Sequence, residues 1–325
     1  MTRYPQIVKL VYETPWAILP SMYDTIRELV RFRVEGGRLS DEDIQARLTA
    51  AGPGHPKTAR GGAVAVLPLY GVIAQRMDMM TEISGGTSTD RFTEMFRQAI
   101  GEPSVGAVVI DVDSPGGSAY GIQELAETIM AARGQKPIIA VANSMAASAA
   151  YWIASAADEV VITPSGEVGS IGVVAGHLDI SAQQEMKGEK VTLISAGEKK
   201  TDHSPFGPLS DSARADIQGR VDEYYNAFVS AVAKGRGVSV AQVRSGFGEG
   251  GMVGAREALQ LGMVDRIGTL DQTIARLVGR SPRGIQAAGQ SVIEPVASLA
   301  AAATDGAVVE PNDLDVRVRR LRLVS

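Results

Sequence analysis

Residues Val108–Gly117 read "VVIDVDSPGG", an apolar, β-branched run that ends in a serine, a proline and two adjacent glycines. The run has the length of a buried strand, and a helical pattern begins just after it. Glycines at a strand end let the backbone turn sharply and present N–H groups to a ligand without a Cβ in the way. The stretch matches neither the phosphate-loop nor the dinucleotide-binding fingerprint, so an ordinary strand-to-helix turn and an anion-binding turn both stay open. For Asp111 and Asp113 we expect a structural role at the end of the sheet.

Similar apolar runs of strand length occur on both sides of this stretch, and helical segments separate several of them. The expected strands are residues 63–74, 106–115, 136–143, 158–164 and 190–197, and the expected helices are residues 89–101, 119–134 and 146–157. Strands that are apolar on both faces and alternate with helices are typical of βα units. The sequence therefore predicts an α/β fold with a mainly parallel sheet flanked by helices.

Three regions differ in composition. Residues 1–60 form an expected N-terminal helical extension that closes with a Pro/Gly hinge. Residues 61–280 hold the predicted α/β domain, including a long amphipathic helix over 209–237 with Ser210 as its N-cap. Residues 281–325 are rich in Ser, Ala, Gly and Pro and end in a basic segment, so we expect a flexible C-terminal tail.

Composition excludes several kinds of protein. The formal net charge of −5 gives no nucleic-acid signature. The chain has no cysteine, and none of its three histidines is spaced as a helical metal pair, so we expect no metal and no cofactor. The one long uncharged run, between Lys136 and Asp158, contains proline and asparagine and is a weak candidate for a membrane span. We therefore expect a soluble, cytoplasmic protein with no membrane anchor.

Ser148 lies in a run of small residues, with alanine at 146, 147, 149 and 150, followed by Tyr151 and Trp152. The surrounding sequence is neither the nucleophile elbow of α/β-hydrolases nor a Ser-x-x-Lys motif. Small neighbours would let a helix N-terminus approach a substrate backbone, where N–H groups favour a developing oxyanion. A buried, alanine-rich helix explains the same pattern without any chemistry.

Five motifs occur in a fixed order: "DVDSPGG" from Asp111, "SMAASAAYWIASAAD" from Ser144, "GEVGSIGVV" from Gly166, "AGEKKTDHSP" from Ala196 and "GMVGAREALQLGMVDRIG" from Gly251. In this order and at similar intervals they resemble the signal peptide peptidase A (S49) family of serine peptidases. The likeness is greatest to its phage branch of minor head proteins that act as capsid assembly proteases, and "YETPWAILP" at residues 12–20 also looks like that branch. The resemblance implies a Clp protease/crotonase-like fold.

The resemblance also implies a site. Ser148 corresponds to the nucleophile of the family and Lys200 to its general base, with Lys199 as the adjacent competitor. Ser170 matches a hydroxyl that positions the lysine. Gly117 and the backbone N–H of Ala149 would form the oxyanion hole.

A Ser/Lys dyad requires a lysine with a lowered pKa. A serine hydroxyl needs a base to become a nucleophile, and a lysine with the ordinary pKa of about 10.4 is protonated at neutral pH. An apolar surround must therefore lower the pKa of the base, and the alanines with Met145, Tyr151 and Trp152 offer one. A Ser-His-Asp triad using His203 is the rival arrangement, with Asp202 or Asp113 as the carboxylate.

The resemblance implies a serine endopeptidase that processes phage capsid, scaffold or portal proteins during head maturation. Its substrate is expected to bind as an extended strand. We expect a homo-oligomer that acts in the cytoplasm or inside the procapsid. The alternatives are a non-catalytic head scaffold protein with the same fold, a cytoplasmic peptide-degrading S49 peptidase and, third, a crotonase-type acyl-CoA enzyme.

Overall fold

The computed structural model describes residues 11–12, 14–34, 64–76 and 86–279. The chain divides into two units, residues 1–281 and 282–325, and all described residues belong to the first. The expected hinge at the end of the N-terminal extension and the expected C-terminal tail lie outside the described residues.

Within the described residues, seven strands form the larger sheet. They are β2 (Val64–Tyr70), β5 (Ala107–Ser114), β7 (Ile138–Ala147), β8 (Glu159–Ile162), β9 (Glu167–Gly169), β10 (Met252–Gly254) and β11 (Arg266–Ile267). β5 pairs parallel with β2 on one side and with β7 on the other, and β7 continues parallel to β8 and β9. Only β10 is antiparallel in this sheet as described, on β9. The predicted, mainly parallel sheet is confirmed.

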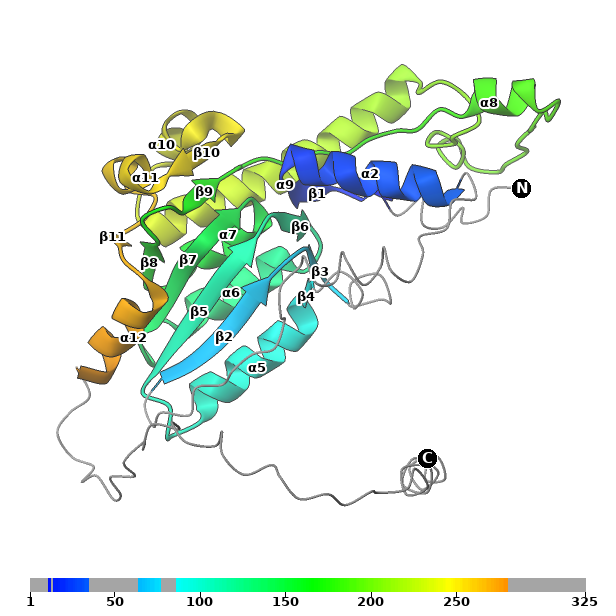
Figure 1. Ribbon diagram of the computed structural model, residues 1–325. Helices are drawn as coiled ribbons and strands as arrows, with labels where there is room; N and C mark the ends of the chain where they lie inside the picture. The colour runs from blue at the N-terminus through cyan, green and yellow to red at the C-terminus, as the bar shows by residue number, and fades with distance from the viewer. Residues whose placement is uncertain (1–10, 13, 35–63, 77–85, 280–325) are drawn as a thin grey trace, which may run out of the picture. The chain divides into compact units, whose positions relative to one another are not determined.

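Helices cover both faces of this sheet (Figure 1). One face packs on α5 (Thr89–Gly101), α6 (Ile122–Ala132), α7 (Ala149–Ser155) and the C-terminal half of α9 (Asp211–Arg236). The other face packs on α12 (Leu270–Gly279). Side chains alternate along β5, because Val108, Ile110 and Val112 enter the first core and Val109 the second. The flanking helices of the prediction are thus in place.

A smaller sheet lies across the end of β5. Its strands, in spatial order, are β1 (Trp16–Ile18), β6 (Gly116–Ser118), β3 (Ile73–Ala74) and β4 (Thr87–Ser88). β1 is antiparallel to β6, and β3 is parallel to it. Helix α2 (Pro20–Val34) follows β1 and confirms the helix expected in the N-terminal extension. Part of that extension therefore pairs directly with the strand that carries Gly117.

Helix α9 begins and ends as its sequence indicates. The Ser210 hydroxyl accepts a hydrogen bond from the N–H of Ala213, which makes it the N-cap. Gly237 ends the helix with φ 67°, the left-handed conformation that glycine adopts at least cost. The remaining short helices are α8 (Ser181–Met186), α10 (Val240–Gly246), a 3₁₀ turn (Gly248–Gly250) and α11 (Ala255–Leu261).

Two local predictions were wrong. Residues 190–197, expected as a strand, are exposed and form no strand, because no described part of the chain pairs with their backbone. The helix expected over 146–157 begins only at Ala149. Ala146 and Ala147 instead extend β7, where they pair with β9.

Candidate active site

Ser148 lies at the junction of β7 and α7. Its φ of 54° is positive, which is uncommon for a residue with a Cβ and costs of the order of 1–3 kcal/mol. The backbone N–H of Ser148 donates to the carbonyl of Gly169 at 2.7 Å, and its hydroxyl donates to the carbonyl of Gly172 at 3.3 Å. The residue is 0% exposed. A strained, fully buried serine at a strand-to-helix turn is typical of a functional position.

The small residues around Ser148 have a steric reason. A Cβ on Gly116 would lie 3.0 Å from the carbonyl oxygen of Ala147, so the glycine turn and the serine turn touch through their backbones. Ala149 and Ala150 are completely buried. Because α7 has only seven residues, any stabilisation of an oxyanion here must come from local N–H groups rather than from a long helix dipole.

Gly117 is enclosed on both edges of its strand. A Cβ at this position would lie 1.9 Å from the carbonyl oxygen of Ile73, so only glycine fits. The register places Gly117 opposite Ala17 of β1 on its other side. The glycine pair therefore serves close backbone approach, as its sequence suggested.

Ser170 lies beside the serine turn. It is buried, has a φ of 52°, and its N–H donates to the carbonyl of Gly251 at 2.7 Å. Its neighbours Gly169 and Gly172 accept the two hydrogen bonds of Ser148. The structure thus brings Ser148, Ser170 and Ala149 into one neighbourhood.

Lys200 lies elsewhere. It is exposed, and its ammonium has no hydrogen-bond or ion-pair partner among the described residues. The neighbouring Lys199 binds Asp216, near the start of α9, at 2.7 and 2.9 Å. Figure 1 shows α8, which precedes this segment, beyond that same end of the helix.

The length of α9 separates this lysine segment from the serine turn. Phe228, in the opposite half of the helix, stacks on Trp152 of α7 with ring centroids 4.7 Å apart. Twelve residues of helix between Asp216 and Phe228 span about 18 Å. Within one chain the structure does not bring Lys200 to Ser148, and His203 lies on the same distant segment.

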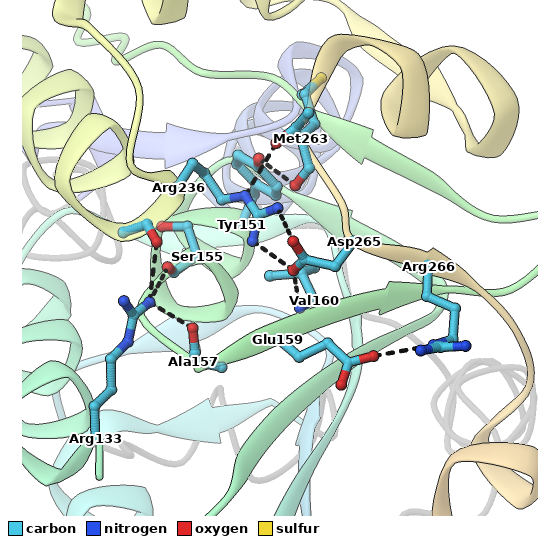
Figure 2. Close-up of polar contacts among 12 residues, drawn as sticks. Arg133, Tyr151, Ser155, Ala157, Glu159, Val160, Arg236, Met263, Asp265 and Arg266 are labelled. Atoms are coloured by element: carbon cyan, nitrogen blue, oxygen red, sulfur yellow. Dashed lines mark hydrogen bonds and ion pairs between the residues drawn. The ribbon is translucent and has the colours of Figure 1, made fainter. Parts of the chain in front are cut away.

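Polar contacts hold α7 in its first and its last turn (Figure 2). The Tyr151 hydroxyl donates to the carbonyl of Met263 at 2.8 Å. The Arg133 guanidinium donates to the carbonyls of Ser155 at 3.0 Å and of Ala156 at 2.9 Å, which have no partner inside the helix. The helix that begins at the serine is therefore anchored in both turns.

A second contact network in Figure 2 joins α9 to β8. Arg236 forms two hydrogen bonds with Asp265, at 2.6 and 2.7 Å, and the N–H of Val160 donates to the same carboxylate at 2.7 Å. Burial acts to raise the pKa of Asp265, but the bonds from Arg236 and Val160 prevail and lower it. This pair holds α9 at the edge of the sheet.

Asp111 confirms the structural role expected for the carboxylates of the first motif. Its buried carboxylate accepts hydrogen bonds from the Tyr70 hydroxyl and from the Asn143 amide. Burial raises the pKa of Asp111, and these two bonds act in the opposite direction. The cluster ties together the ends of β2, β5 and β7, the last two of which lead into Gly117 and Ser148.

Two participants in the site could not be predicted from the sequence. Gly172 acts through its backbone carbonyl, which any residue carries. Residues 15–18 belong to a stretch that resembles the phage branch of the family, but their short apolar pattern does not predict that residues 16–18 pair with β6. In the part of the chain that the structure describes, no three His, Asp or Glu side chains are grouped to hold a metal. No described helix is long and apolar enough to cross a bilayer.

Comparison with known proteins agrees with the motifs. Residues 131–280 match the family model of peptidase family S49. The chain is 32% identical over 239 residues to the capsid assembly protease C of Escherichia phage lambda, covering 72% of this chain and 54% of the relative. It is 34% identical over 204 residues to the head-tail preconnector protein GP5 of Enterobacteria phage P21, covering 63% of this chain and 40% of the relative. The chain thus spans about half the length of these curated relatives or less.

Solved structures with a similar trace include two peptidases. One is the 1510-N membrane protease specific for a stomatin homolog from Pyrococcus horikoshii, with TM-score 0.40 and 16% identity over 66% of this chain and 78% of that one. The other is a ClpP1 variant from Listeria monocytogenes, with TM-score 0.39 and 16% identity over 63% of this chain and 92% of that one. Residues 131–280 of this chain are thus similar to peptidase family S49, and the similarity to the two phage proteins extends over a larger part of the chain.

Proposed function

We propose that this protein is a serine endopeptidase that processes phage capsid, scaffold or portal proteins during head maturation. The observation that carries the proposal is the buried, positive-φ Ser148 between two glycine-bearing turns. The names of two phage relatives, a capsid assembly protease and a head-tail preconnector protein, indicate the kind of substrate. The cytoplasm or the interior of the procapsid is the proposed place of action.

We propose that the general base comes from a second copy of the chain. Among the described residues, the hydrogen bond of the Ser148 hydroxyl goes to the carbonyl of Gly172 and not to a basic side chain. Lys200 lies on a segment that exposes apolar side chains with nothing to cover them, among them Ile194 at 96% exposure. Docking of that segment on a neighbouring copy would bury both the apolar residues and the amine, and burial favours the neutral form that a base requires.

The proposed reaction then follows the roles of a Ser/Lys dyad. The neutral amine of Lys200 accepts the proton of the Ser148 hydroxyl as the oxygen attacks the scissile carbonyl. The N–H groups of Ala149 and Gly117 would stabilise the oxyanion. The ammonium returns its proton to the leaving amine, and a water molecule hydrolyses the acyl-enzyme. Ser170 is proposed to orient the incoming lysine.

A mixing experiment tests the base and its origin together. Ser148→Ala and Lys200→Ala variants, each alone, should leave the head proteins of the same phage uncleaved in co-expression, as read by mass spectrometry of the protein ends. The two variants mixed should recover cleavage, because one supplies the lysine and the other the serine. Lys199→Ala and His203→Ala are the matched controls and should retain most of the activity.

The outcomes separate the alternatives. Cleavage that survives Ser148→Ala would show that the peptidase proposal is wrong. Loss in His203→Ala with activity in Lys200→Ala would favour the triad. The exposed position of Lys200 also suits a non-catalytic head scaffold protein, for which the protein ends would be the same in wild type and in Ser148→Ala.

A further inference from the structure

Strand β1 occupies a position between two segments that flank Ser148. On one side it pairs antiparallel with β6, which carries Gly116 and Gly117. On the other side Trp16 pairs antiparallel with Val174, two residues beyond the carbonyl that accepts the Ser148 hydroxyl. We call this place, between β6 and residues 172–174, the strand position beside Ser148.

The backbone hydrogen bonds of this position are satisfied from within the chain. Trp16 and Val174 exchange two bonds of 2.8 Å. Toward β6, Leu19 donates to Pro115 and Ala119 donates to Pro15, both at 2.9 Å. Hydrogen-bonded pairs recur at every second residue of an antiparallel ladder, so Ala17 and Gly117, midway between these bonds, form one too.

Side chains of β1 fill both faces of the position. Ala17 is completely buried in the main core, together with Ala146, Ala149 and Ile73. Trp16 and Ile18 point to the opposite face and join a separate apolar cluster, whose buried members are Val11, Tyr12, Trp16, Ile18, Tyr23 and Val30. A strand with a small side chain toward the serine turn and large ones away from it thus fits here.

An extended peptide substrate would need these same groups. Peptides that add to a sheet gain affinity from main-chain N–H and C=O groups at an open edge. Here β3 takes one edge of β6 and β1 takes the other, and Ser148 has no exposed surface. A peptide therefore cannot bind beside Ser148 while β1 is in place.

We infer that residues Pro15–Ile18 form an autoinhibitory strand. They occupy the strand position beside Ser148, and a peptide substrate must displace them to bind there. The inference rests on the proposed function. Displacement is compatible with the packing, since the large side chains of the segment, Trp16 and Ile18, belong to a separate cluster with Tyr23 of α2 rather than to the main core. Displacement of the strand would withdraw one small side chain, that of Ala17, from the main core.

A reversible disulfide tests whether β1 must move. Trp16 and Ser118 are opposite each other in a pair that lacks direct backbone bonds, where Cα atoms are about 4.5 Å apart, within the range of a disulfide. The chain has no other cysteine, so the double variant Trp16→Cys, Ser118→Cys forms one defined bond. The probe is an alanyl diphenyl phosphonate extended by two alanines, and its reaction with Ser148 is followed by intact mass.

The reduced double variant should react, and the oxidised form should react at least tenfold more slowly. Each single cysteine variant serves as the control and should show one rate under both conditions. Equal rates in the oxidised and reduced double variant would overturn the autoinhibitory strand while leaving the proposed peptidase intact. Absence of Ser148 labelling in every state would overturn the proposed function and this inference with it.

A variant that releases β1 should have the opposite effect on the rate of Ser148 labelling. Ala17→Asp places a carboxylate in the apolar core and should expel β1, so labelling should become at least fivefold faster than in wild type. Ser21→Asp, at an exposed position of α2, is the matched control and should label at the wild-type rate. A folded Ala17→Asp protein, verified by circular dichroism, that labels no faster than the control would contradict the inference.

Discussion

The two residues of the proposed dyad lie in opposite kinds of surroundings. Ser148 is completely buried, and Trp152, one turn further along α7, stacks on Phe228 at 4.7 Å. Every residue from 187 to 200 is exposed, although several of them are apolar. The serine turn is therefore organised by the core of its own chain, whereas the lysine segment is not packed against that core.

The largest effect on stability is expected in the region of Ser148. Trp152→Ala removes a fully buried ring together with its stacking on Phe228, and should lower the free energy of unfolding by about 3–5 kcal/mol. Ile194→Ala, in the exposed segment, is the control and should leave it within about 0.5 kcal/mol of wild type. Urea denaturation measures both. If both variants lost similar amounts of unfolding free energy, the conclusion that only the serine region is packed in the core would be wrong.

A smaller, pH-dependent effect is expected at Asp111. Burial raises the pKa of this carboxyl in the folded chain, so charging it costs more there than in the unfolded chain. Stability from the protonated form is full below the unfolded pKa of about 3.9 and is lost as the pH rises through the folded pKa. Relative to Asp111→Asn, wild type should therefore lose free energy of unfolding as the pH rises above about 4.

Asp265 supplies the control for that experiment, because its pKa is shifted the other way. Burial acts against the shift, but Arg236 and Val160 lower the pKa of the Asp265 carboxyl. Its stabilisation is present above the unfolded pKa and is lost as the pH falls through the folded one. Relative to Asp265→Asn, wild type should gain stability as the pH rises, and equal slopes for the two variants would contradict both assignments.

The smallest effect on stability is expected on the lysine side. At a protein concentration low enough to dissociate any assembly, Ile194→Asp should leave the melting temperature of the chain unchanged, since the side chain contacts almost nothing within it. It should lower the mass of the assembled protein in multi-angle light scattering, because a buried charge weakens an interface. Val278→Asp, exposed on α12, is the control. An unchanged mass for Ile194→Asp would remove this segment from the interface.

Where a pattern reports on packing within the chain, the sequence predicted the structure well. The β-branched runs around β5 and β7 are buried on both faces, so their composition alone indicated a parallel sheet. The Ser210 cap and the glycines of the first motif follow from local backbone chemistry in the same way. For the site, family likeness pointed to the serine turn that the structure shows as buried and strained.

The sequence could not predict structure that depends on a pairing strand elsewhere in the chain. Residues 190–197 have the composition of a strand, but composition does not say whether an edge is available to pair with them. Residues 16–18 are too short for periodicity to distinguish a strand from a loop. Their place beside Gly117 depends on contacts roughly a hundred positions away in the chain.

Helix α9 has a geometric consequence for any closed assembly. It runs for 26 residues, about 39 Å, from the segment of Lys199 to the layer beneath Ser148. The helix therefore holds the lysine segment and the serine turn of one chain at a constant offset. In an assembly in which Lys200 serves the Ser148 of a neighbouring copy, as proposed above, this offset would set how far apart the serine turns of the two copies lie.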